Sequence, residues 1–592
     1  MITAPVTGFD LIHVGPLACV HGPHHLTPVS FSGKRMTMAP IEVGAGAFIG
    51  QNSCLAPASK VSAGAFVDPL SSVPRGAGLV FGHWSGVPAR QVGPHDRSRV
   101  PAAGAGNCMA VAGGICSCFT WVLRLVPQIL APLLLVTVLK MLLSQYQMIK
   151  LTPQAAQQQK DNEQLSYLDG LPPAVFSHLY LAHAAAAGMA ITNVLFQLLW
   201  TVLVCRLLPK VKAPLDLPMC SFMSFVASLK LQLASKTSML LGDASVQAVF
   251  TWLIGAQVGK GASLSEQVML PDTLQIGRDC FFASGNVLTS IVVDQGRMRI
   301  PTKTVIGNQV FLGNTNHISE GLPNGTFCGL HTWVPTKPTV PGENFFGNPA
   351  MKFGRPSSHG SEAPPSRRQV FWYHFSTSVV DIFFWDILKA QEWALAFMIS
   401  TSCFKGSDSW PVLVFEVLIF AAMPVIFWFL MHIVFCNRIY NDRCPLSNDF
   451  YSGVVMRWFN ANKIRRIFQS PFMAGGTMWQ APLMRLVGIH VGARFFATGE
   501  DVMIDPPFGR IGDDVTFDYD AQVRQHSFED RKLKWGPNWV GSGTTILQGG
   551  CLAMSDAGEG VVLRHSSVTW KGQLLEPNQD YEGAPAVAVA EA

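Results

Sequence analysis

The sequence predicts a multi-domain membrane protein in which three parallel β-helix domains alternate with hairpins of transmembrane α-helices. Three observations carry this prediction. An aliphatic residue occupies every sixth position from Val43 to Leu79, four apolar runs approach or exceed the length of a bilayer crossing, and matching patterns recur at constant shifts along the chain. Together they indicate a repeated unit of membrane hairpin, surface helix and β-helix.

The hexad pattern is most regular near the N-terminus. The aliphatic positions are Val43, Ile49, Leu55, Val61, Val67, Val73 and Leu79, and the fifth place of each hexad is Ala or Ser. A helix repeats near 3.6 residues and a flat strand near 2, so a period of six fits neither. Six-residue periodicity indicates a parallel β-helix, in which each hexad forms one short strand and a corner.

Composition limits the functional classes. The chain has 592 residues, too many for one core, and only 14% are charged, with a mean hydropathy of +0.27. A net charge of +5 without a dense basic tract argues against a nucleic-acid partner. The thirteen cysteines form no regular framework, which indicates free thiols in a reducing compartment, and the N-terminus does not look like a signal peptide.

The first half of the chain divides by composition. The segments are β-helix 1 at 1–92, a linker at 93–118, transmembrane hairpin 1 at 119–212, an amphipathic interfacial segment at 213–250 and β-helix 2 at 251–356. Within hairpin 1 we expect spans at 119–143 and 183–205. β-helix 2 shows the hexad positions Ile276, Phe282, Leu288, Ile306, Leu312, Ile318 and Leu330.

The second half repeats this order. The segments are a linker at 357–369, transmembrane hairpin 2 at 370–437, an interfacial segment at 438–485, β-helix 3 at 486–588 and a tail at 589–592. Hairpin 2 holds apolar runs at 370–400 and 411–436. The first run carries Asp381, Asp386, Lys389 and Glu392, so an interfacial or buried helix is the alternative there. β-helix 3 shows Ile511, Phe517, Val523, Val540, Ile546, Leu552, Val562, Val568 and Leu574.

The basic residues predict the topology. Arg206, Lys210 and Lys212 follow the second apolar run, and a second basic group at 438–466 follows the fourth. By the positive-inside rule both regions lie on the cytosolic side, so all three β-helices and both termini are expected on the cytosolic face of a multi-pass integral membrane protein.

An internal repeat links the three β-helices. The segment from Val14 to Leu55 aligns without a gap on 511–552 at a shift of 497, and Ile276 aligns on Ile511 at a shift of 235. At the shift of 497 the N-terminal copy lacks its first coil, so we expect that Met1 is not a natural domain edge.

Two resemblances follow from these motifs. The hexads, with closing segments at 86–89, 347–350 and 583–586 that read Gly-x-Pro-Ala, resemble the trimeric hexapeptide-repeat transferases, which implies a left-handed β-helix. The whole layout resembles the membrane-bound C-terminal region of nonribosomal peptide synthetase-like enzymes of the ε-poly-lysine synthetase type, which implies amide-bond formation. Tandem tethering can replace the trimer internally. The chain has no phosphopantetheine attachment motif and no adenylation domain, so the acyl group has to be activated on a separate adenylation and carrier protein.

The hexapeptide resemblance also implies a histidine near a coil corner as general base. His526 stands in such a place, with Glu529 and Asp530 as candidate orienting carboxylates, and the aligned residues, Val29 and Ile291, cannot transfer a proton. Neighbouring polar residues are candidates for binding an acidic or phosphorylated substrate group: Gln525, Arg531 and Lys532. The alternative is a solvated polar corner with a structural histidine.

Other histidines form the second choice. These are His24, His25 and His317. His21, His24 and His25 lie within five residues, but a metal is not expected there. The γ-type carbonic anhydrases, which share the β-helix, take their three zinc ligands from neighbouring coils and an adjacent subunit. No nucleotide-binding loop or serine-hydrolase elbow is present, so no bound cofactor is expected. The resemblances imply that the donor is acyl-CoA or a phosphopantetheinyl thioester supplied in trans.

Three functions remain open from the sequence. The first is a membrane-bound acyl- or aminoacyl-transferase that forms amide bonds with a carrier thioester. The second is an acyl-CoA-dependent transferase acting on a lipid or sugar at the membrane. The third is a catalytically inactive β-helix scaffold.

Overall fold

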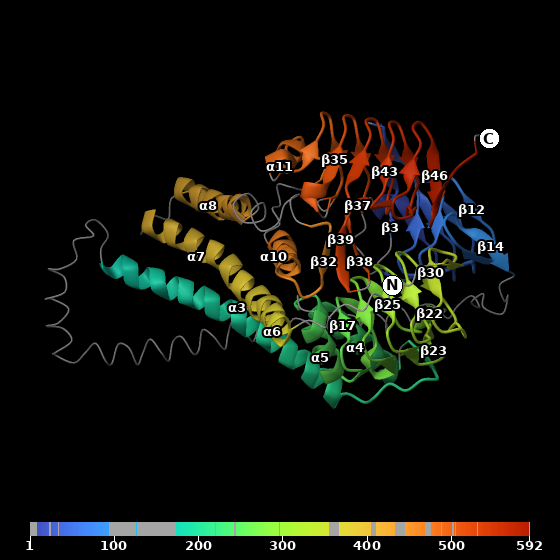
Figure 1. Cartoon of the computed structure of the whole chain (residues 1–592), viewed down its shortest axis with the longest axis horizontal. Helices are drawn as coiled ribbons and strands as arrows, with labels where there is room; N and C mark the ends of the chain where they lie inside the picture. Colours follow the sequence, from blue (N-terminus) through green and yellow to red (C-terminus); the bar gives the residue numbers. More distant parts are fainter. Residues whose placement is uncertain are drawn as a thin grey trace.

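The computed structural model describes most of the β-helical sequence and a set of long helices. The described residues are 9–22, 25–33, 35–93, 126, 173–219, 221–241, 244–294, 296–354, 366–403, 410–431, 445–467, 475–486, 488–499, 502–503, 505–529 and 531–590. They form three parallel β-helices that lie side by side, and the helices α3 (Pro173–Leu207), α7 (Trp385–Cys403) and α8 (Trp410–Phe429) project away from them (Figure 1). The prediction of parallel β-helices is therefore confirmed.

The first β-helix follows the hexad register. Its faces are β1 (Ile12–Val14), β6 (Ile41–Val43), β9 (Lys60–Val61) and β12 (Gly78–Leu79); β2 (Cys19–Val20), β7 (Phe48–Ile49), β10 (Phe66–Val67), β13 (His83–Ser85) and β14 (Arg90–Gly93); and β3 (His25–Leu26), β8 (Cys54–Leu55) and β11 (Ser72–Val73). Parallel pairs such as Val43 with Val61 show that three hexads make one coil. All the predicted aliphatic positions from Val43 to Leu79 are buried, as the period of six requires.

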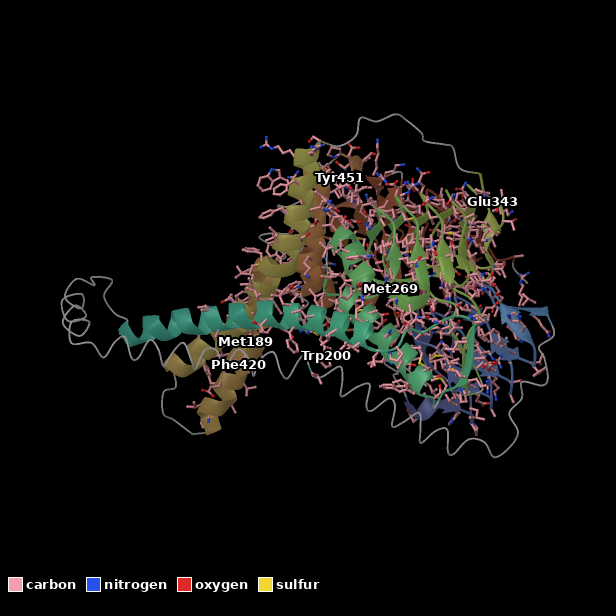
Figure 2. All side chains as sticks on the ribbon, turned by 90° about the horizontal axis from the view of Figure 1, so that it is seen from below. Met189, Trp200, Met269, Glu343, Phe420 and Tyr451 are labelled. Carbon is pink, nitrogen blue, oxygen red and sulfur yellow. The ribbon has the colours of Figure 1, made fainter. Side chains whose placement is uncertain are left out.

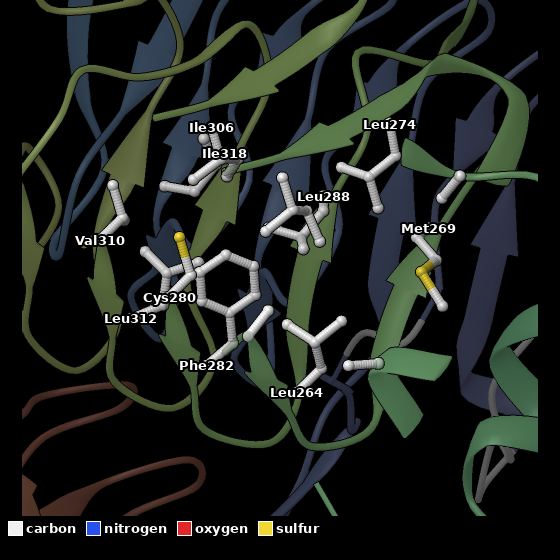
Figure 3. Close-up of a cluster of buried hydrophobic side chains, with 14 of the residues drawn as sticks. Leu264, Met269, Leu274, Cys280, Phe282, Leu288, Ile306, Val310, Leu312 and Ile318 are labelled. Carbon is white, nitrogen blue, oxygen red and sulfur yellow. The ribbon is translucent and has the colours of Figure 1, made fainter. Parts of the chain in front are cut away.

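The second β-helix keeps the register until its last coil. Its faces are β16 (Gln257–Val258), β19 (Leu274–Ile276), β24 (Thr304–Ile306) and β27 (Gly321–Leu322); β17 (Ser263–Leu264), β20 (Phe281–Phe282), β25 (Phe311–Leu312), β28 (Phe327–Cys328), β30 (Asn344–Phe346) and β31 (Met351–Lys352); and β18 (Gln267–Met269), β21 (Asn286–Leu288), β26 (His317–Ile318) and β29 (Trp333–Val334). Figure 3 shows the aliphatic and aromatic side chains of this core, with Phe282 and Leu312 packed together.

Leu330 does not belong to that inward column. Ile306 pairs with Leu322 and Leu312 with Cys328, so the last coil falls short of three full hexads. Leu322 and Cys328 therefore take the inward positions and are fully buried. Leu330 faces the neighbouring β-helix, because shortening a coil moves every later residue to another place on the coil.

The third β-helix contains a similar change. Its faces are β33 (His490–Val491), β35 (Gly509–Ile511), β40 (Asn538–Val540), β43 (Asp556–Ala557) and β45 (Leu574–Leu575); β34 (Phe496–Ala497), β36 (Thr516–Phe517), β41 (Thr545–Ile546), β44 (Val562–Leu563), β46 (Asp580–Gly583) and β47 (Ala586–Ala588); and β37 (Gln522–Arg524) and β42 (Cys551–Ala553). Ile546 pairs with Leu563, so this coil is also shorter than three hexads. Leu563 and Leu575 are therefore fully buried, whereas the predicted inward residue Leu574 is 61% exposed.

Each β-helix carries an excursion hairpin at the position that the internal repeat predicts. The hairpins are β4 (Val29–Ser32) with β5 (Arg35–Met38), β22 (Val292–Asp294) with β23 (Arg297–Ile300), and β38 (His526–Glu529) with β39 (Lys532–Trp535). The shift that aligns Val14 with Ile511 also aligns the first hairpin with the third, and the shift that aligns Ile276 with Ile511 aligns β23 with β39. In the second and third copies an upstream strand joins the hairpin, β15 (Leu215–Pro218) or β32 (Ser447–Asp449).

Each hairpin reaches across to another β-helix, and the contacts close into a ring. Ser30 of the first β-helix donates to Asp518 of the third at 2.8 Å. Arg531 of the third pairs with Asp279 of the second at 3.3 Å. The backbone N–H of Val293 in the second donates to His21 Nε2 of the first at 3.3 Å. A head-to-tail contact that closes after three copies is the geometry of a cyclic trimer, here within one chain.

The Gly-x-Pro-Ala segments meet where the three β-helices converge. Gly86, Gly347 and Gly583 all have positive φ, and each is followed by a residue joined to proline by a cis peptide bond. A Cβ on Gly347 would overlap the carbonyl oxygen of Ala584 in the third β-helix. Only glycine permits this approach of one backbone to another, so the motif serves the contact between β-helices as well as the end of a coil.

Shorter helices attach the long ones to the β-helices. They are α4 (Phe222–Ser238) and α5 (Ala244–Leu253) before the second β-helix, and α10 (Gly453–Ile467) and α11 (Gln480–Leu486) before the third. Lys230 of α4, fully buried, donates to Asp272 at 2.7 Å and to the carbonyl oxygens of Leu208 and Pro209 at the end of α3. A buried charge needs such partners, so this contact fixes the end of α3 against the second β-helix.

The long helices pack on one another. α3 runs along α7, and α7 packs on α8. Before α7 the chain forms α6 (Arg367–Phe375) and a π-helical segment, η4 (Ser376–Phe384). In Figure 2 the labelled residues Met189 of α3 and Phe420 of α8 lie on the part of these helices that extends beyond the β-helices.

The described helices do not by themselves support four membrane spans. Among the described residues, His183–Leu207 is the one helical stretch long and apolar enough to cross a membrane. It has 25 residues and a mean hydropathy of 1.8, and 17% of its most apolar window is buried inside the protein. The apolar stretch in α8, Val414–Phe429, is shorter. The predicted span at 119–143 lies outside the described residues except for Val126. Multi-pass insertion therefore stays a prediction.

The apolar run at 370–400 is helical, but three of its charged residues, Asp386, Lys389 and Glu392, form ion pairs within the protein. Lys389 contacts Glu392 at 2.6 Å, and Asp386 contacts Lys463 of α10 at 3.5 Å. Glu392 is fully buried. This packing agrees with the alternative that the run is a buried or interfacial helix, since charges are costly in contact with lipid.

Candidate functional site

His526 begins strand β38 and is held by a buried carboxylate. Its Nδ1 lies 2.5 Å from Oδ2 of Asp505, whose side chain is fully buried, while the imidazole is 12% exposed. Asp505 precedes the 3-10 helix η7 (Pro506–Phe508), and its backbone N–H donates to Gln525 Oε1 at 3.0 Å. A carboxylate on Nδ1 favours the tautomer with the proton on Nδ1, which leaves Nε2 as the proton acceptor.

Trp458 of α10 completes this group. Its indole Nε1 donates to the other carboxylate oxygen of Asp505 at 2.7 Å. The edge of the indole meets the imidazole of His526 at a centroid distance of 4.7 Å. Both oxygens of Asp505 are therefore engaged, one by the histidine and one by a neutral donor.

A cavity of about 270 Å³ lies between the second and third β-helices, with His526 in its wall. The wall from the second β-helix is apolar and includes Phe311, Phe327 and Phe346. Phe311 and Phe327 stack with centroids 4.7 Å apart, and Phe346 stacks on Trp570 of the third β-helix at 4.4 Å. The cavity is thus an aromatic groove with one imidazole facing it, the usual character of a small-molecule site.

The polar wall of the cavity contains an ion-pair cluster. Glu529 accepts from Lys534 and from Lys571, both at 3.1 Å, and Lys571 also donates to Ser527 at 3.2 Å. Burial by itself raises the pKa of Glu529, but the two ammonium groups outweigh it and hold that pKa below its usual value. Arg524, another lining residue, donates to the amide oxygen of Gln522. The charged residues that line the cavity are thus Arg524 and Lys571 against the single carboxylate of Glu529, so this wall carries a net positive charge at neutral pH.

The prediction that Glu529 orients His526 is wrong, because Glu529 pairs with Lys534 and Lys571 and the histidine is oriented by Asp505. The other candidate carboxylate, Asp530, lies outside the described residues. Asp505 lies a full coil upstream of His526, too far for a search confined to the neighbouring sequence. The internal repeat did contain a signal for Asp505, because at the shift of 235 this carboxylate in the third β-helix aligns with the apolar residue Leu270 in the second.

The predicted substrate-binding residues lie around the cavity without lining it. Gln525 is fully buried and supports the backbone of Asp505. Arg531 pairs with Asp279 of the second β-helix, and Lys532 lies 4.0 Å from Asp449. Arg531 and Lys532 therefore contribute to contacts between elements, while the cationic residues that line the cavity are Arg524 and Lys571. These two were not identified from the sequence.

Among the second-choice histidines, His317 is the one whose side chain the structure describes. His317 is 6% exposed on β26 against Trp333, and burial, followed by the proximity of His21, lowers the pKa of His317 to about 3. His25 begins strand β3, and His24 lies outside the described residues. Within the described part of the chain no group of three His, Cys, Asp or Glu residues could hold a metal ion.

The cysteines of the described residues are not activated nucleophiles. Six cysteines whose side chains the structure describes are free and buried: Cys19, Cys54, Cys205, Cys280, Cys328 and Cys551. Burial raises the pKa of Cys280 to about 11 and that of Cys19 to about 11. Since the thiolate is the nucleophile, covalent thiol catalysis is not favoured at these positions.

Comparisons with known proteins give a limited result. No family model matches the chain, and no curated protein matches it. Among solved structures, a maltose O-acetyltransferase from Clostridium difficile 630 matches at 24% identity over 17% of this chain, with a TM-score of 0.16. The match spans 58% of that enzyme.

Soybean serine acetyltransferase also matches, in complex with serine and as the apoenzyme. The identities are 13% and 11%, each match covers 38% of this chain and 85% of the soybean chain, and the TM-scores are 0.13 and 0.12. All of these solved structures are acetyltransferases. At such identities and TM-scores we draw no conclusion about substrate or activity from them, and the β-helix of this chain stands on its own strand pairing.

Proposed function

We propose that this chain is an acyltransferase that moves an acyl group from a thioester to an amine or hydroxyl, in the cavity between the second and third β-helices. The observation that carries the proposal is the contact of His526 with the buried Asp505 at the wall of that cavity. A buried carboxylate behind an imidazole, with the second ring nitrogen toward a groove, is the arrangement of a general base.

The chemistry follows from this geometry. His526 Nε2 takes the proton of the acceptor N–H or O–H as the acceptor attacks the thioester carbonyl carbon. The new C–N or C–O bond forms, the C–S bond breaks, and the imidazolium returns the proton to the departing thiolate. The products are an amide or ester and a free thiol. Asp505 stabilises the imidazolium in between and stays ionised.

The two walls of the cavity suggest how the substrates lie. The aromatic wall with Phe311, Phe327 and Trp570 fits an acyl chain or the apolar arm of a thioester. The positive wall with Arg524 and Lys571 fits a phosphate or carboxylate group. Both features agree with a phosphopantetheine thioester, either on a carrier protein in trans, as the resemblance to the peptide synthetase-like enzymes implies, or in acyl-CoA.

We also propose that the projecting helices anchor the protein in a membrane, with the β-helices on the cytosolic side. Large apolar side chains are exposed along them: Met189, Leu195, Leu199 and Leu203 on α3, and Val414, Phe415, Val417 and Leu418 on α8. Exposed apolar surface of this extent calls for a covering, and lipid supplies it. Protease digestion of sealed vesicles tests the orientation, since cleavage between Arg510 and Arg531 from the non-cytosolic side would contradict it.

Thiol release by the full chain in detergent micelles tests the catalytic proposal. The donors are acyl-CoA and, separately, an acylated phosphopantetheinyl carrier protein, each offered with a panel of amines and alcohols. We expect His526→Ala to lower turnover by about 10²- to 10⁴-fold. The matched control is His490→Ala, an exposed histidine on β33 of the same β-helix. Equal rates for wild type and His526→Ala would overturn the proposal.

The same assay separates the three functions that the sequence left open. Turnover with the carrier protein alone favours amide synthesis from a carrier thioester. Turnover with free acyl-CoA and a lipid or sugar acceptor favours the acyl-CoA-dependent transferase. An inert chain that still binds a partner protein is a scaffold.

A further inference from the structure

Helix α10 joins the catalytic histidine to the projecting helices. Trp458, near its middle, is 5% exposed and makes the 2.7 Å hydrogen bond to Asp505. On the same helix, Asn460 accepts from the indole Nε1 of Trp385 at 2.8 Å and donates to the hydroxyl of Ser376 at 3.1 Å. Both partners belong to the η4–α7 segment, which packs on the proposed anchor helices α3 and α8, so one stretch of α10 contacts both this segment and the site.

Further contacts keep α10 in this place. Lys463 lies 3.5 Å from Asp386 at the start of α7. Tyr373 of α6 is 1% exposed and packs against Phe450 just before α10. Phe459 in turn stacks against Phe528 on the strand that carries His526. A helix packed on both sides moves as a unit, so a displacement of η4–α7 would also move Trp458.

The hydrogen bond of Trp458 has a definite electrostatic effect. A neutral donor on a carboxylate stabilises its ionised form and disperses its charge. Asp505 with this donor in place therefore stabilises the imidazolium of His526 less than a bare carboxylate would. The other charged groups around the histidine line the cavity, and they are Arg524, Glu529 and Lys571, with Lys534 behind Glu529.

We infer that Trp458 is a positioning residue that sets the proton affinity of His526 through Asp505, and that α10 couples this setting to the seating of the membrane-anchoring helices. The inference rests on the proposed function for its catalytic meaning. The site is then an enzyme centre whose base strength depends on whether the anchor helices are in their native surroundings.

Trp458→Phe is the direct test, since it keeps most of the ring and removes the N–H. We expect the titration midpoint of His526 to move upward by about one pH unit, because Asp505 loses a donor. The measurement is an NMR titration of the full chain in nanodiscs with isotope-labelled histidine, in which the His526 signal is assigned as the one missing from His526→Gln. Trp539→Phe is the control, a tryptophan 46% exposed on β40.

Asn460→Leu tests the coupling and leaves Trp458 in the protein. It removes the hydrogen bonds to Trp385 and Ser376, so we expect the titration midpoint of His526 to shift in the same direction. If α10 couples the site to the anchor helices, the midpoint of the wild type differs between nanodiscs and detergent, and we expect this difference to be smaller in Asn460→Leu. This variant also carries the test if Trp458→Phe does not fold. A titration of His526 unchanged in both variants overturns the inference.

The titration needs no substrate, so the two proposals fail separately. If the titration shifts but no variant or wild type transfers an acyl group, the positioning role stands and the acyltransferase proposal fails. If His526→Ala is inactive while Trp458→Phe keeps the wild-type pH profile of kcat/KM and the wild-type titration, the acyltransferase stands and the positioning role fails.

Discussion

At two interfaces of the ring, equivalent hairpins of two β-helices have different surroundings. Between the second and third β-helices, the hairpin presents His526 to Asp505 and leaves a cavity of about 270 Å³. Between the first and third, the residue equivalent to His526 is Val29, and the hairpin is held to the third β-helix by hydrogen bonds. Ser30 and the backbone N–H of Phe31 donate to Asp518 at 2.8 and 3.2 Å, and Gly33 donates to Thr545 at 3.3 Å.

Each of these interfaces contains a buried acid. Asp505 faces an imidazole and an indole N–H, whereas Asp518 receives a hydroxyl and backbone amides. Burial raises the pKa of Asp518, and the Ser30 hydroxyl and the amides offset only part of that rise. The two acids are not equivalent in the repeat, since Asp505 belongs to the same β-helix as its hairpin and Asp518 to the neighbouring one. The side chains around each acid decide whether it can assist proton transfer.

The largest expected effect breaks both interfaces at once. Leu575→Asp places an unpaired charge in the buried column of the third β-helix, which costs several kcal/mol, so we expect loss of the folded domain. Leu574→Asp is the matched control, because Leu574 is 61% exposed. Limited proteolysis of the full chain in detergent reports the difference. Equal protection of the two variants would contradict the register in which Leu563 and Leu575 point into the core.

The comparison of the two acids predicts opposite results for one substitution. Asp505→Asn should lower turnover by about 10²- to 10⁴-fold, because an amide stabilises the imidazolium poorly and disturbs the tautomer. Asp518→Asn should leave turnover close to wild type. Thiol release under saturating donor measures both. Similar losses in the two variants would show that the acids share a structural role.

A glycine substitution tests the contact between the Gly-x-Pro-Ala segments where the three β-helices converge. Gly347→Ala places a Cβ against the carbonyl oxygen of Ala584 and has an unfavourable positive φ of 84°, so we expect a loss of about 1–3 kcal/mol at the contact of the second and third β-helices. Gly342→Ala has a similar φ, 75°, but open space around the Cβ. The difference between their thermal midpoints isolates the interface term from backbone strain. Equal midpoints would mean that the segments do not touch at the axis.

The effect that is smallest at neutral pH, and grows only in acid, concerns two buried histidines. Burial lowers the pKa of His317 to about 3 and that of His565 to about 4, against 6.5 in the unfolded chain. Between these values the unfolded chain binds protons that the folded protein does not. The stability is therefore complete above pH 6.5 and falls as pH drops toward 4, by up to about 1.4 kcal/mol per pH unit for each histidine.

His317→Gln should flatten this dependence. We expect backbone amides of β26 to lose less hydrogen-exchange protection between pH 7 and pH 5, after correction for intrinsic exchange, than in wild type. His490→Gln, at an exposed strand position, is the control. A dependence as steep in His317→Gln as in wild type would assign the acid sensitivity to other groups.

The sequence by itself determined the β-helices, their repeat and the position of the proposed base. The period of six is a local property: Ile49, Leu55 and Val61 point inward because each coil places them there, and no distant residue is needed to know it. The constant shifts aligned the segments that form the three hairpins, and the contrast of His526 with Val29 and Ile291 followed from them. Where a coil is shorter than three hexads, as before Leu330 and Leu574, the local rule failed, because strand pairing and not spacing sets the register.

Only the tertiary structure decided what surrounds His526. Asp505 lies a coil away from it in the chain, Trp458 is farther still, and Phe311, Phe327 and Phe346 of the aromatic wall belong to another β-helix. These contacts arise from closing the ring and from laying α10 across the hairpin, and neither leaves a periodic trace in the sequence. Hydrogen bonds act over about 3 Å in space whatever the separation along the chain, so the partners of a catalytic residue depend on how remote segments pack together.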